Sequence, residues 1–217
     1  MTDPNYTAIA VLMDRSGSME SVRSDAEGAL QAFIEDQRAL PGTCTIRLAD
    51  FDTEYQTIYP SLPIDRAPRY QLVPRGGTAL LDSIHRLVTE FGAELSAMPE
   101  DRRPSKVLVV VQTDGEENSS KTFTREQVFA LIEQQRRDYH WNFVFLGANQ
   151  DAIAAGMSMG FTQGSSMTYN TSTAGMSNTR RSLSTYAGNV RAAASGAATM
   201  DMAFTEEDRL GAVATDD

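Results

Sequence analysis

The sequence has one cysteine, no long apolar run and an excess of acidic over basic residues. One cysteine among 217 residues excludes an intramolecular disulfide and a cysteine-based zinc site. The longest apolar run near the start, Ala8 to Met13, is far too short to cross a bilayer. The 29 Asp and Glu outweigh the 19 Lys and Arg, and the net charge is −10. Phosphate binding needs a basic surface, so we expect neither nucleic acid nor a membrane as a partner.

The rest of the composition is typical of a globular protein, with 41% hydrophobic and 22% charged residues. The first residues, Met1 to Pro4, lack the basic segment of a secretion signal, so we expect a cytoplasmic protein. Cys44 has no His or Lys beside it in the sequence, and we expect it to be a buried strand residue rather than a reactive thiol.

Apolar stretches that alternate with amphipathic ones predict an α/β fold. Continuous apolar stretches predict buried strands, and 3.6-residue periodicity predicts helices. Strands are expected at Tyr6–Met13, Thr43–Phe51 (half-buried), Tyr55–Tyr59 (an antiparallel edge), Lys106–Gln112 and Trp141–Gly147. Helices are expected at Glu20–Leu40, Leu80–Leu95, Thr124–Asp138 and Gln150–Met157, with a loop from Pro60 to Gly77. This order predicts a doubly wound, mostly parallel sheet with helices on both faces.

The composition changes after Asp151. Residues 152–200 carry three charged groups, all arginine, and are rich in Ser, Thr, Ala, Gly and Met. We therefore divide the chain into a domain of residues 1–165 and a low-charge extension of residues 166–217 that ends in an acidic tail. Two interpretations of this extension stay open. It is either the last strand and helix of the same domain or a docking arm that orders on a partner.

Two further features of the extension bear on that choice. An Ala-rich helix is expected over Arg180–Ala194. Six of the ten methionines lie between Met157 and Met202. They either fill the core, which we favour, or form an adaptable contact surface.

Polar residues with oxygen side chains follow the expected buried strands. Asp14, Ser16 and Ser18 come directly after the first strand, in a Gly-containing turn that leads into a helix. Asp114 follows the Lys106–Gln112 strand, and Thr78 precedes the second helix. Ligands of α/β sheets bind outside the carboxyl ends of the strands. Oxygen-only ligands suit a hard cation such as Mg²⁺, Mn²⁺ or Ca²⁺.

Each of these features is weak alone, since Ser16 and Thr78 are also typical helix N-caps. Together, Asp14-x-Ser16-x-Ser18, Thr78 and Asp114 resemble the metal-ion-dependent adhesion site of von Willebrand factor type A domains. The resemblance extends over roughly residues 7–160. It implies a Rossmann-like sheet with one antiparallel edge strand.

The resemblance also implies how the site works. The hydroxyls of Ser16, Ser18 and Thr78 hold a divalent ion, and Asp14 and Asp114 act directly or through bound water. An open coordination position then accepts an Asp or Glu carboxylate of a partner protein. This is a binding mechanism, so no enzyme activity is expected.

Three stretches resemble a narrower group, the small stand-alone type A proteins of bacteria and bacteriophages. They are Arg75–Asp82, Thr113–Ser119 and Trp141–Asn149. If the sequence comes from a phage, a virion-associated location becomes an alternative to the cytoplasm. The sequence leaves the partner and the oligomeric state open.

Two other functions compete with metal-dependent binding. A phage or bacterial structural or assembly protein, whose ion mainly stabilises the fold, is the first. A phosphatase-like hydrolase is the second and is less favoured, because the position of its second acid is occupied by Ser16. A serine hydrolase would need a Gly-x-Ser-x-Gly motif, which neither Ser16 nor Ser18 provides.

Five residues are candidates for the partner-binding rim around the ion. Arg15 lies inside the first motif and Arg75 precedes Gly76, so either cation would attract an acidic partner. The alternative is a surface charge or a local salt bridge. Glu116, Glu117 and Asn118 follow Asp114 closely, and we expect them to border the site.

Overall fold

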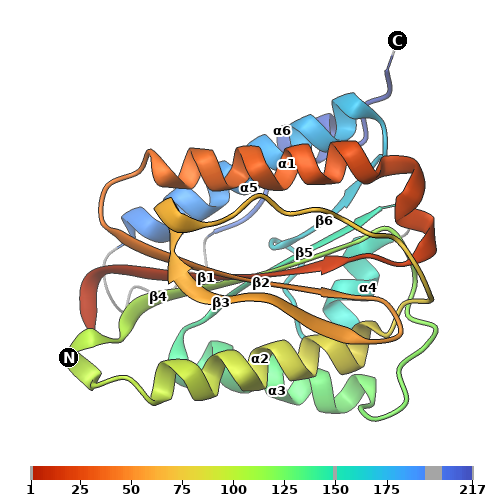
Figure 1. Cartoon of the computed structure of the whole chain (residues 1–217). Coiled ribbons are helices and arrows are strands. Elements are labelled where there is room, and N and C mark those ends of the chain that lie inside the picture. Colours follow the sequence, from red (N-terminus) through yellow and green to blue (C-terminus); the bar gives the residue numbers. More distant parts are fainter. Residues whose placement is uncertain (1, 149–150, 194–201, 217) are drawn as a thin grey trace.

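The chain folds around one mixed sheet (Figure 1). The computed structural model describes residues 2–148, 151–193 and 202–216. The strand order is β3-β2-β1-β4-β5-β6, and among these strands β3 is antiparallel to its neighbour while the other pairs are parallel. The predicted α/β fold with one antiparallel edge strand is therefore confirmed.

The elements have these bounds. The strands are β1 (Asp3–Asp14), β2 (Thr43–Phe51), β3 (Tyr55–Pro63), β4 (Pro104–Thr113), β5 (Asn142–Ala148) and β6 (Ser166–Tyr169). The α-helices are α1 (Arg23–Arg38), α2 (Leu80–Ser96), α3 (Arg125–Tyr139), α4 (Ala152–Ser158), α5 (Thr173–Ala192) and α6 (Glu206–Ala212). Short 3₁₀ helices are η1 (Gly17–Val22), η2 (Ile64–Arg66) and η3 (Glu100–Arg102). The expected helices that include residues 150 and 194 extend there outside the described residues.

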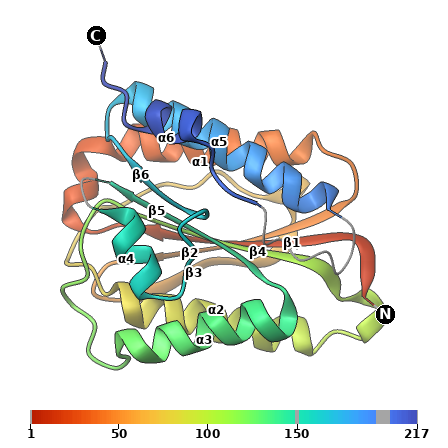
Figure 2. The same ribbon diagram turned by 180° about the vertical axis from the view of Figure 1, so that it is seen from behind.

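The sheet is covered on both faces, as Figures 1 and 2 show from opposite sides. Helices α1, α5 and α6 lie on one face, and α2, α3 and α4 lie on the other. β1 supplies both cores because successive side chains of a strand point to opposite faces. Ile9 and Val11 belong to the core under α1 and α5, whereas Ala10 and Leu12 belong to the core under α2.

The expectation that β2 is half-buried is wrong. Seven of its nine residues are buried, because the strand lies between β1 and β3 and helices cover both of its faces. The polar position that suggested exposure is Arg47. Its guanidinium is buried in ion pairs with Glu90 and Glu94 of α2. A charged residue in a strand pattern thus marked a contact with a helix rather than with solvent.

Two predicted boundaries also move. The expected helix from Glu20 starts as η1 and becomes α-helical only at Arg23. The expected loop from Pro60 begins later, because β3 continues to Pro63 and η2 follows it. The antiparallel edge is therefore longer than the apolar pattern predicted.

The C-terminal region packs into the same core as the rest of the chain. β6 pairs with β5 through Phe145 opposite Ser166 and Leu146 opposite Met167. Met167, Met176 and Leu183 join one core cluster with residues of β1 and α1. A boundary at residue 165 therefore does not separate two cores. Of the four methionines from Met157 to Met176, only Met157 is exposed.

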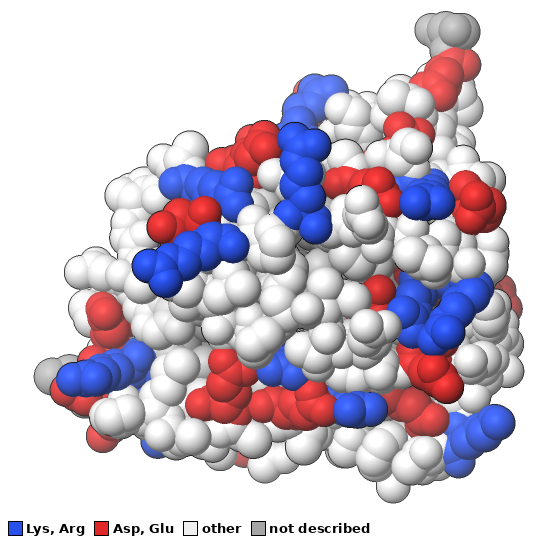
Figure 3. Space-filling model, in the orientation of Figure 1, with Lys and Arg blue, Asp and Glu red and all other residues white. Residues whose placement is uncertain are grey.

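Charges of both signs are interspersed on the face drawn in Figure 3. Among the described residues, several surface charges pair locally, as Arg86 does with Glu90 and Arg23 with Glu27. Among the described residues, no helix has both the length and the apolar character needed to span a bilayer.

We predict that α5 contributes to global stability. Leu183 is 6% exposed, and Leu210 of α6 is 66% exposed. Leu183→Ala should lower the free energy of unfolding by about 3 kcal/mol, because it leaves a cavity in the core. The matched variant Leu210→Ala should cost less than about 0.5 kcal/mol. Urea unfolding monitored by circular dichroism measures both. Equal small losses would mean that α5 is docked without being part of the cooperative core.

Candidate metal site

The five predicted ligands come together at the carboxyl edge of the sheet. Asp14 is the last residue of β1, and Asp114 directly follows β4, its parallel neighbour. Ser16 and Ser18 lie at the start of η1. Thr78 lies just before α2, which begins at Leu80. Parallel pairing of β1 and β4 brings these three segments to one edge, as expected for a ligand site in an α/β sheet.

The hydroxyls of this cluster converge on one point. Ser16 Oγ lies 3.1 Å from Ser18 Oγ, and Ser18 Oγ donates to Asp114 Oδ1 at 2.7 Å. A methyl group built on Gly115 would lie 3.2 Å from Thr78 Oγ1, 3.8 Å from Ser18 Oγ and 4.0 Å from Ser16 Oγ. Three hydroxyls from two loops thus surround the space above Gly115, which a side chain there would fill.

Asp14 is fully buried and is held from two sides. Its Oδ1 accepts a hydrogen bond from Ser16 N at 2.6 Å, and its Oδ2 accepts one from Thr113 Oγ1 at 2.5 Å. Burial raises the pKa of Asp14 to about 6, although both hydrogen bonds act in the opposite direction. Burial also raises the pKa of Asp114, again against the bond from Ser18.

Neither carboxylate has a basic partner within the described residues, where no ion pair of Asp14 or Asp114 to Lys or Arg occurs. Removing a carboxylate from water without a cation is costly, so these two groups suit a bound metal ion. The described residues contain no cluster of three or more His, Cys, Asp and Glu that would hold a metal by itself. A metal here therefore needs the hydroxyls, and two carboxylates with three hydroxyls fit a hard cation such as Mg²⁺.

Thr78 does not cap α2. The N-cap residue is Ala79, whose own side chain makes no cap hydrogen bond. The backbone of Thr78 is instead held by Asn118. Asn118 Oδ1 accepts from Thr78 N at 2.9 Å, and Asn118 N donates to Thr78 O at 3.1 Å. The threonine hydroxyl is thus left pointing at the cluster through contacts of its own main chain.

Of the predicted rim residues after Asp114, Glu117 has a structural contact. Its carboxylate accepts from Leu81 N at 2.9 Å and from Ser119 N and Ser120 N at 2.8 Å each. It therefore ties the loop after β4 to the first turn of α2, where free backbone amides favour an anion. Glu116 is exposed beside the site.

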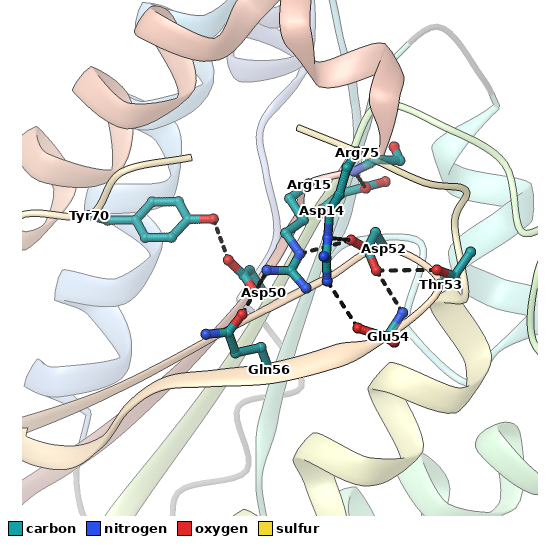
Figure 4. Close-up of polar contacts among 10 residues, drawn as sticks. Asp14, Arg15, Asp50, Asp52, Thr53, Glu54, Gln56, Tyr70 and Arg75 are labelled. Atoms are coloured by element: carbon teal, nitrogen blue, oxygen red, sulfur yellow. Dashed lines mark hydrogen bonds and ion pairs between the residues drawn. The ribbon is translucent and has the colours of Figure 1, made fainter. Parts of the chain in front are cut away.

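The two rim arginines differ in exposure. Arg15 is 6% exposed, and it pairs with Asp50 and Asp52 at the end of β2 (Figure 4). The side chain of Arg75 is 54% exposed and pairs with Asp52 and Glu54. The structure thus places the Arg15 side chain in a buried ion-pair network, next to the candidate metal ligands in the sequence, and the Arg75 side chain at the surface.

Sequence reasoning missed several residues that support the site. Asp50 and Asp52 stand at the carboxyl end of β2, which was a usable signal for this edge. Thr113 opens the Thr113–Ser119 stretch, but its bond to Asp14 was not foreseen. The role of Tyr169 of β6 could not be predicted from the sequence around it. Its hydroxyl reaches across β5 and donates to Thr113 O at 3.3 Å. That contact depends on the sheet order, which a local pattern does not contain.

The fold is that of von Willebrand factor type A domains. A type A protein from Catenulispora acidiphila matches 86% of this chain and 43% of its own, at 17% identity and a TM-score of 0.59. Proximal thread matrix protein 1 from the mussel byssus matches 88% of this chain and 48% of its own, at 14% identity and a TM-score of 0.61. A further structure of that mussel protein has a zinc-occupied metal-ion-dependent adhesion site (85% and 46% covered, 14% identity, TM-score 0.58).

The match spans less than half the length of each of these solved chains. At such low identities, the likeness establishes the fold and nothing further. No family model and no curated protein matches the sequence.

We predict that ionised Asp14 destabilises the metal-free protein. Its pKa of about 6 exceeds the roughly 3.9 of an unfolded aspartate, so the folded state resists ionisation. In EDTA, the wild type should lose on the order of 2 kcal/mol of stability from this group between pH 4 and pH 7. Asp14→Asn should lack this loss. Urea unfolding of both proteins at several pH values measures the difference. Parallel pH profiles would contradict the prediction. We prefer Asn to Ala because Asp14 ends a strand and is buried, so truncation would also open a cavity.

We also predict that Asp82 anchors the loop before α3. Its carboxylate accepts from Lys121 N at 2.8 Å, Phe123 N at 2.8 Å and Thr122 N at 3.1 Å. These bonds lower its pKa against the effect of burial. The resulting stability is present above the unfolded pKa of about 4 and is lost as pH falls through the lower folded value. Asp82→Ala should cost about 1 kcal/mol at pH 7, and the cost should shrink as the pH falls below the unfolded pKa. A cost that persists at low pH would point to packing instead.

Proposed function

We propose that this chain is a divalent-metal-dependent, adhesion-type protein-binding domain. In this proposal, Mg²⁺ lies among Asp14, Ser16, Ser18, Thr78 and Asp114 and presents an open position to an Asp or Glu carboxylate of a partner protein. Mn²⁺ and Ca²⁺ are the alternative ions. The observation that carries the proposal is the space above Gly115, which three hydroxyls surround. The zinc-occupied site of the mussel protein with the same fold supports it.

The residues present fit this role chemically. Neutral hydroxyls donate little charge, so an ion held largely by them stays electron-poor and favours an added carboxylate. The bound ion supplies this Lewis acidity. Asp14, held by Ser16 and Thr113, keeps its carboxylate at the end of β1, and Asp114 orients Ser18 by accepting a hydrogen bond from its hydroxyl. No group of the cluster needs to act as a nucleophile.

A metal that mainly stabilises an assembly protein is the second candidate. The observation in its favour is that the Asp14 carboxylate is fully buried, because a cation would relieve the cost of that buried charge. A hydrolase remains the least favoured, since Ser16 stands where a second catalytic acid would be needed.

We predict that Ser18 is needed for metal binding and that its neighbour in η1, Ser21, is not. The two serines are exposed, and Ser21 Oγ donates to Ser18 O rather than facing the cluster. Isothermal titration with Mn²⁺ should give a dissociation constant at least about tenfold higher for Ser18→Ala, by loss of a ligand. Ser21→Ala should bind as the wild type does. Equal affinity of all three proteins would refute the site.

Partner recognition needs a separate experiment. Proteins captured from a bacterial lysate by the immobilised chain in Mg²⁺ should be released by EDTA. They should be lost with Ser18→Ala and retained with Ser21→Ala. Converting lysate carboxylates to amides with a carbodiimide and an excess of a small amine, both removed before capture, should abolish capture. Capture that survives EDTA or amidation contradicts carboxylate recognition. A Mg²⁺-dependent rise in melting temperature without any capture favours the stabilising role.

A further inference from the structure

We propose that Asp52, together with Arg15 and Arg75, is a positioning device that fixes the distance between the two loops that carry the metal-binding hydroxyls. This inference rests on the proposed function. One loop carries Ser16 and Ser18, and the other carries Thr78. Asp52 lies at the end of β2, outside the predicted ligand set, and is 1% exposed.

The Asp52 side chain contacts both loops at once (Figure 4). Its Oδ2 accepts from Arg75 Nε at 2.6 Å and lies 3.2 Å from Arg15 Nε. Its Oδ1 accepts from Glu54 N at 2.7 Å, which holds the tight turn between β2 and β3. One buried carboxylate therefore joins the first metal loop, the loop before α2 and its own turn.

Main-chain hydrogen bonds join the same segments as these ion pairs do. Arg75 N donates to Arg15 O at 2.8 Å, and Gly17 N donates to Gly76 O at 3.2 Å. Ala79 N donates to Asp52 O at 2.8 Å. Arg15 lies between Asp14 and Ser16, and Ala79 follows Thr78. The network is thus one residue away from three predicted ligands.

The close approach of Gly76 to Asp52 leaves little freedom in this arrangement. Gly76 has a positive φ of 67°, and a methyl group on it would lie 3.3 Å from Asp52 Cβ and from Thr53 Oγ1. A side chain at this position would be strained and would push the loop away from Asp52.

A second buried acid braces Arg15 from the other side. Asp50 Oδ1 lies 3.2 Å from Arg15 Nη1, and Asp50 Oδ2 accepts from the Tyr70 hydroxyl at 3.0 Å. Arg15 Nη1 also donates to Gln56 Oε1 of β3 at 2.8 Å. The Arg15 side chain is therefore held from β2 and β3, and Tyr70 of the loop after η2 holds Asp50 in place. Breaking such a buried pair leaves a charge uncompensated, so we place the test at the surface member, Arg75.

The test compares Arg75→Gln with Arg86→Gln. The two arginines are matched, because their side chains are 54% and 55% exposed and each donates from Nε to a carboxylate, at 2.6 and 2.8 Å. Arg86 pairs with Glu90 on α2, outside the network. Mn²⁺ binding is measured by isothermal titration, and the melting temperature is measured in EDTA.

The direction in which the Mn²⁺ dissociation constant changes distinguishes positioning from simple electrostatics. Removing a positive charge near the site should strengthen cation binding if charge alone matters. Loss of positioning should instead raise the Mn²⁺ dissociation constant of Arg75→Gln about tenfold, as is usual for groups that orient metal ligands. Arg75→Lys, which keeps the charge and one donor, should recover part of the affinity. Arg86→Gln should bind Mn²⁺ as the wild type does, with a similar melting temperature to Arg75→Gln.

A measurement without metal tests the same idea. In EDTA, Arg75→Gln should speed amide hydrogen exchange at Gly17 and Ala79, whose bonds to Gly76 and Asp52 cross between the loops. Exchange at Leu81, bound to Glu117, should not change.

Wild-type or tighter Mn²⁺ affinity in Arg75→Gln would overturn the positioning role. So would an equal loss of affinity in Arg86→Gln. If the wild type binds no Mn²⁺, or if Ser18→Ala binds equally well, the proposed function fails and this inference fails with it. If binding depends on Ser18 but not on Arg75, the inference alone fails.

Discussion

The parallel pairing of β1 with β2 and β4 is the constraint on which the rest of this structure depends. It places Asp14, Asp52 and Asp114 at one edge of the sheet, although 100 residues of sequence separate the first from the last. The strands themselves are held by apolar cores on both faces. The position of each acid is therefore set by packing and not by the acid's own interactions. Charge at this edge is tolerated because hydrophobic burial elsewhere stabilises the fold.

The charges of the acids at this edge, of which Asp114 is only partly buried, are accommodated in two different ways. Asp50 and Asp52 pair with Arg15, and Asp52 also pairs with Arg75, so their charges are balanced within the protein. Asp14 and Asp114 receive only hydroxyl and amide hydrogen bonds within the described residues. The first pair is fixed by its ion pairs, whereas the second pair has no cation among the described residues, which is why we propose a metal ion for it.

Much of this arrangement could be predicted from the sequence, because its signals are local. The apolar run of β1 predicts a buried strand, and Asp14, Ser16 and Ser18 lie directly at its carboxyl end. The meeting of these residues with Asp114 is then expected from the rule that parallel strands share a carboxyl edge. The five proposed ligands did come together, while their metal-binding role stays a prediction.

The features that could not be predicted depend on contacts between distant segments. The burial of the Arg15 side chain could be predicted only with the knowledge that Asp50 and Asp52 lie beside it. The burial of β2 depends on its place between β1 and β3, and the burial of Arg47 depends on its ion pairs with α2; no periodicity within β2 contains that information. The region after residue 165 has few charges and many small residues, so its composition resembled a flexible segment. Its packing is decided by a few large side chains, such as Met167 and Leu183, that fit against β1 and α1.

The hydroxyl of Tyr169 links the last strand to the functional edge. It donates to the carbonyl of Thr113, whose own hydroxyl holds Asp14. The smallest unit that keeps the geometry of Asp14 therefore includes β6, and a protein shortened before this strand would lose a support of the cluster as well as part of its core. Exchange of this edge strand between relatives would thus be expected to change the geometry of the proposed metal site without replacing any of its five proposed ligands.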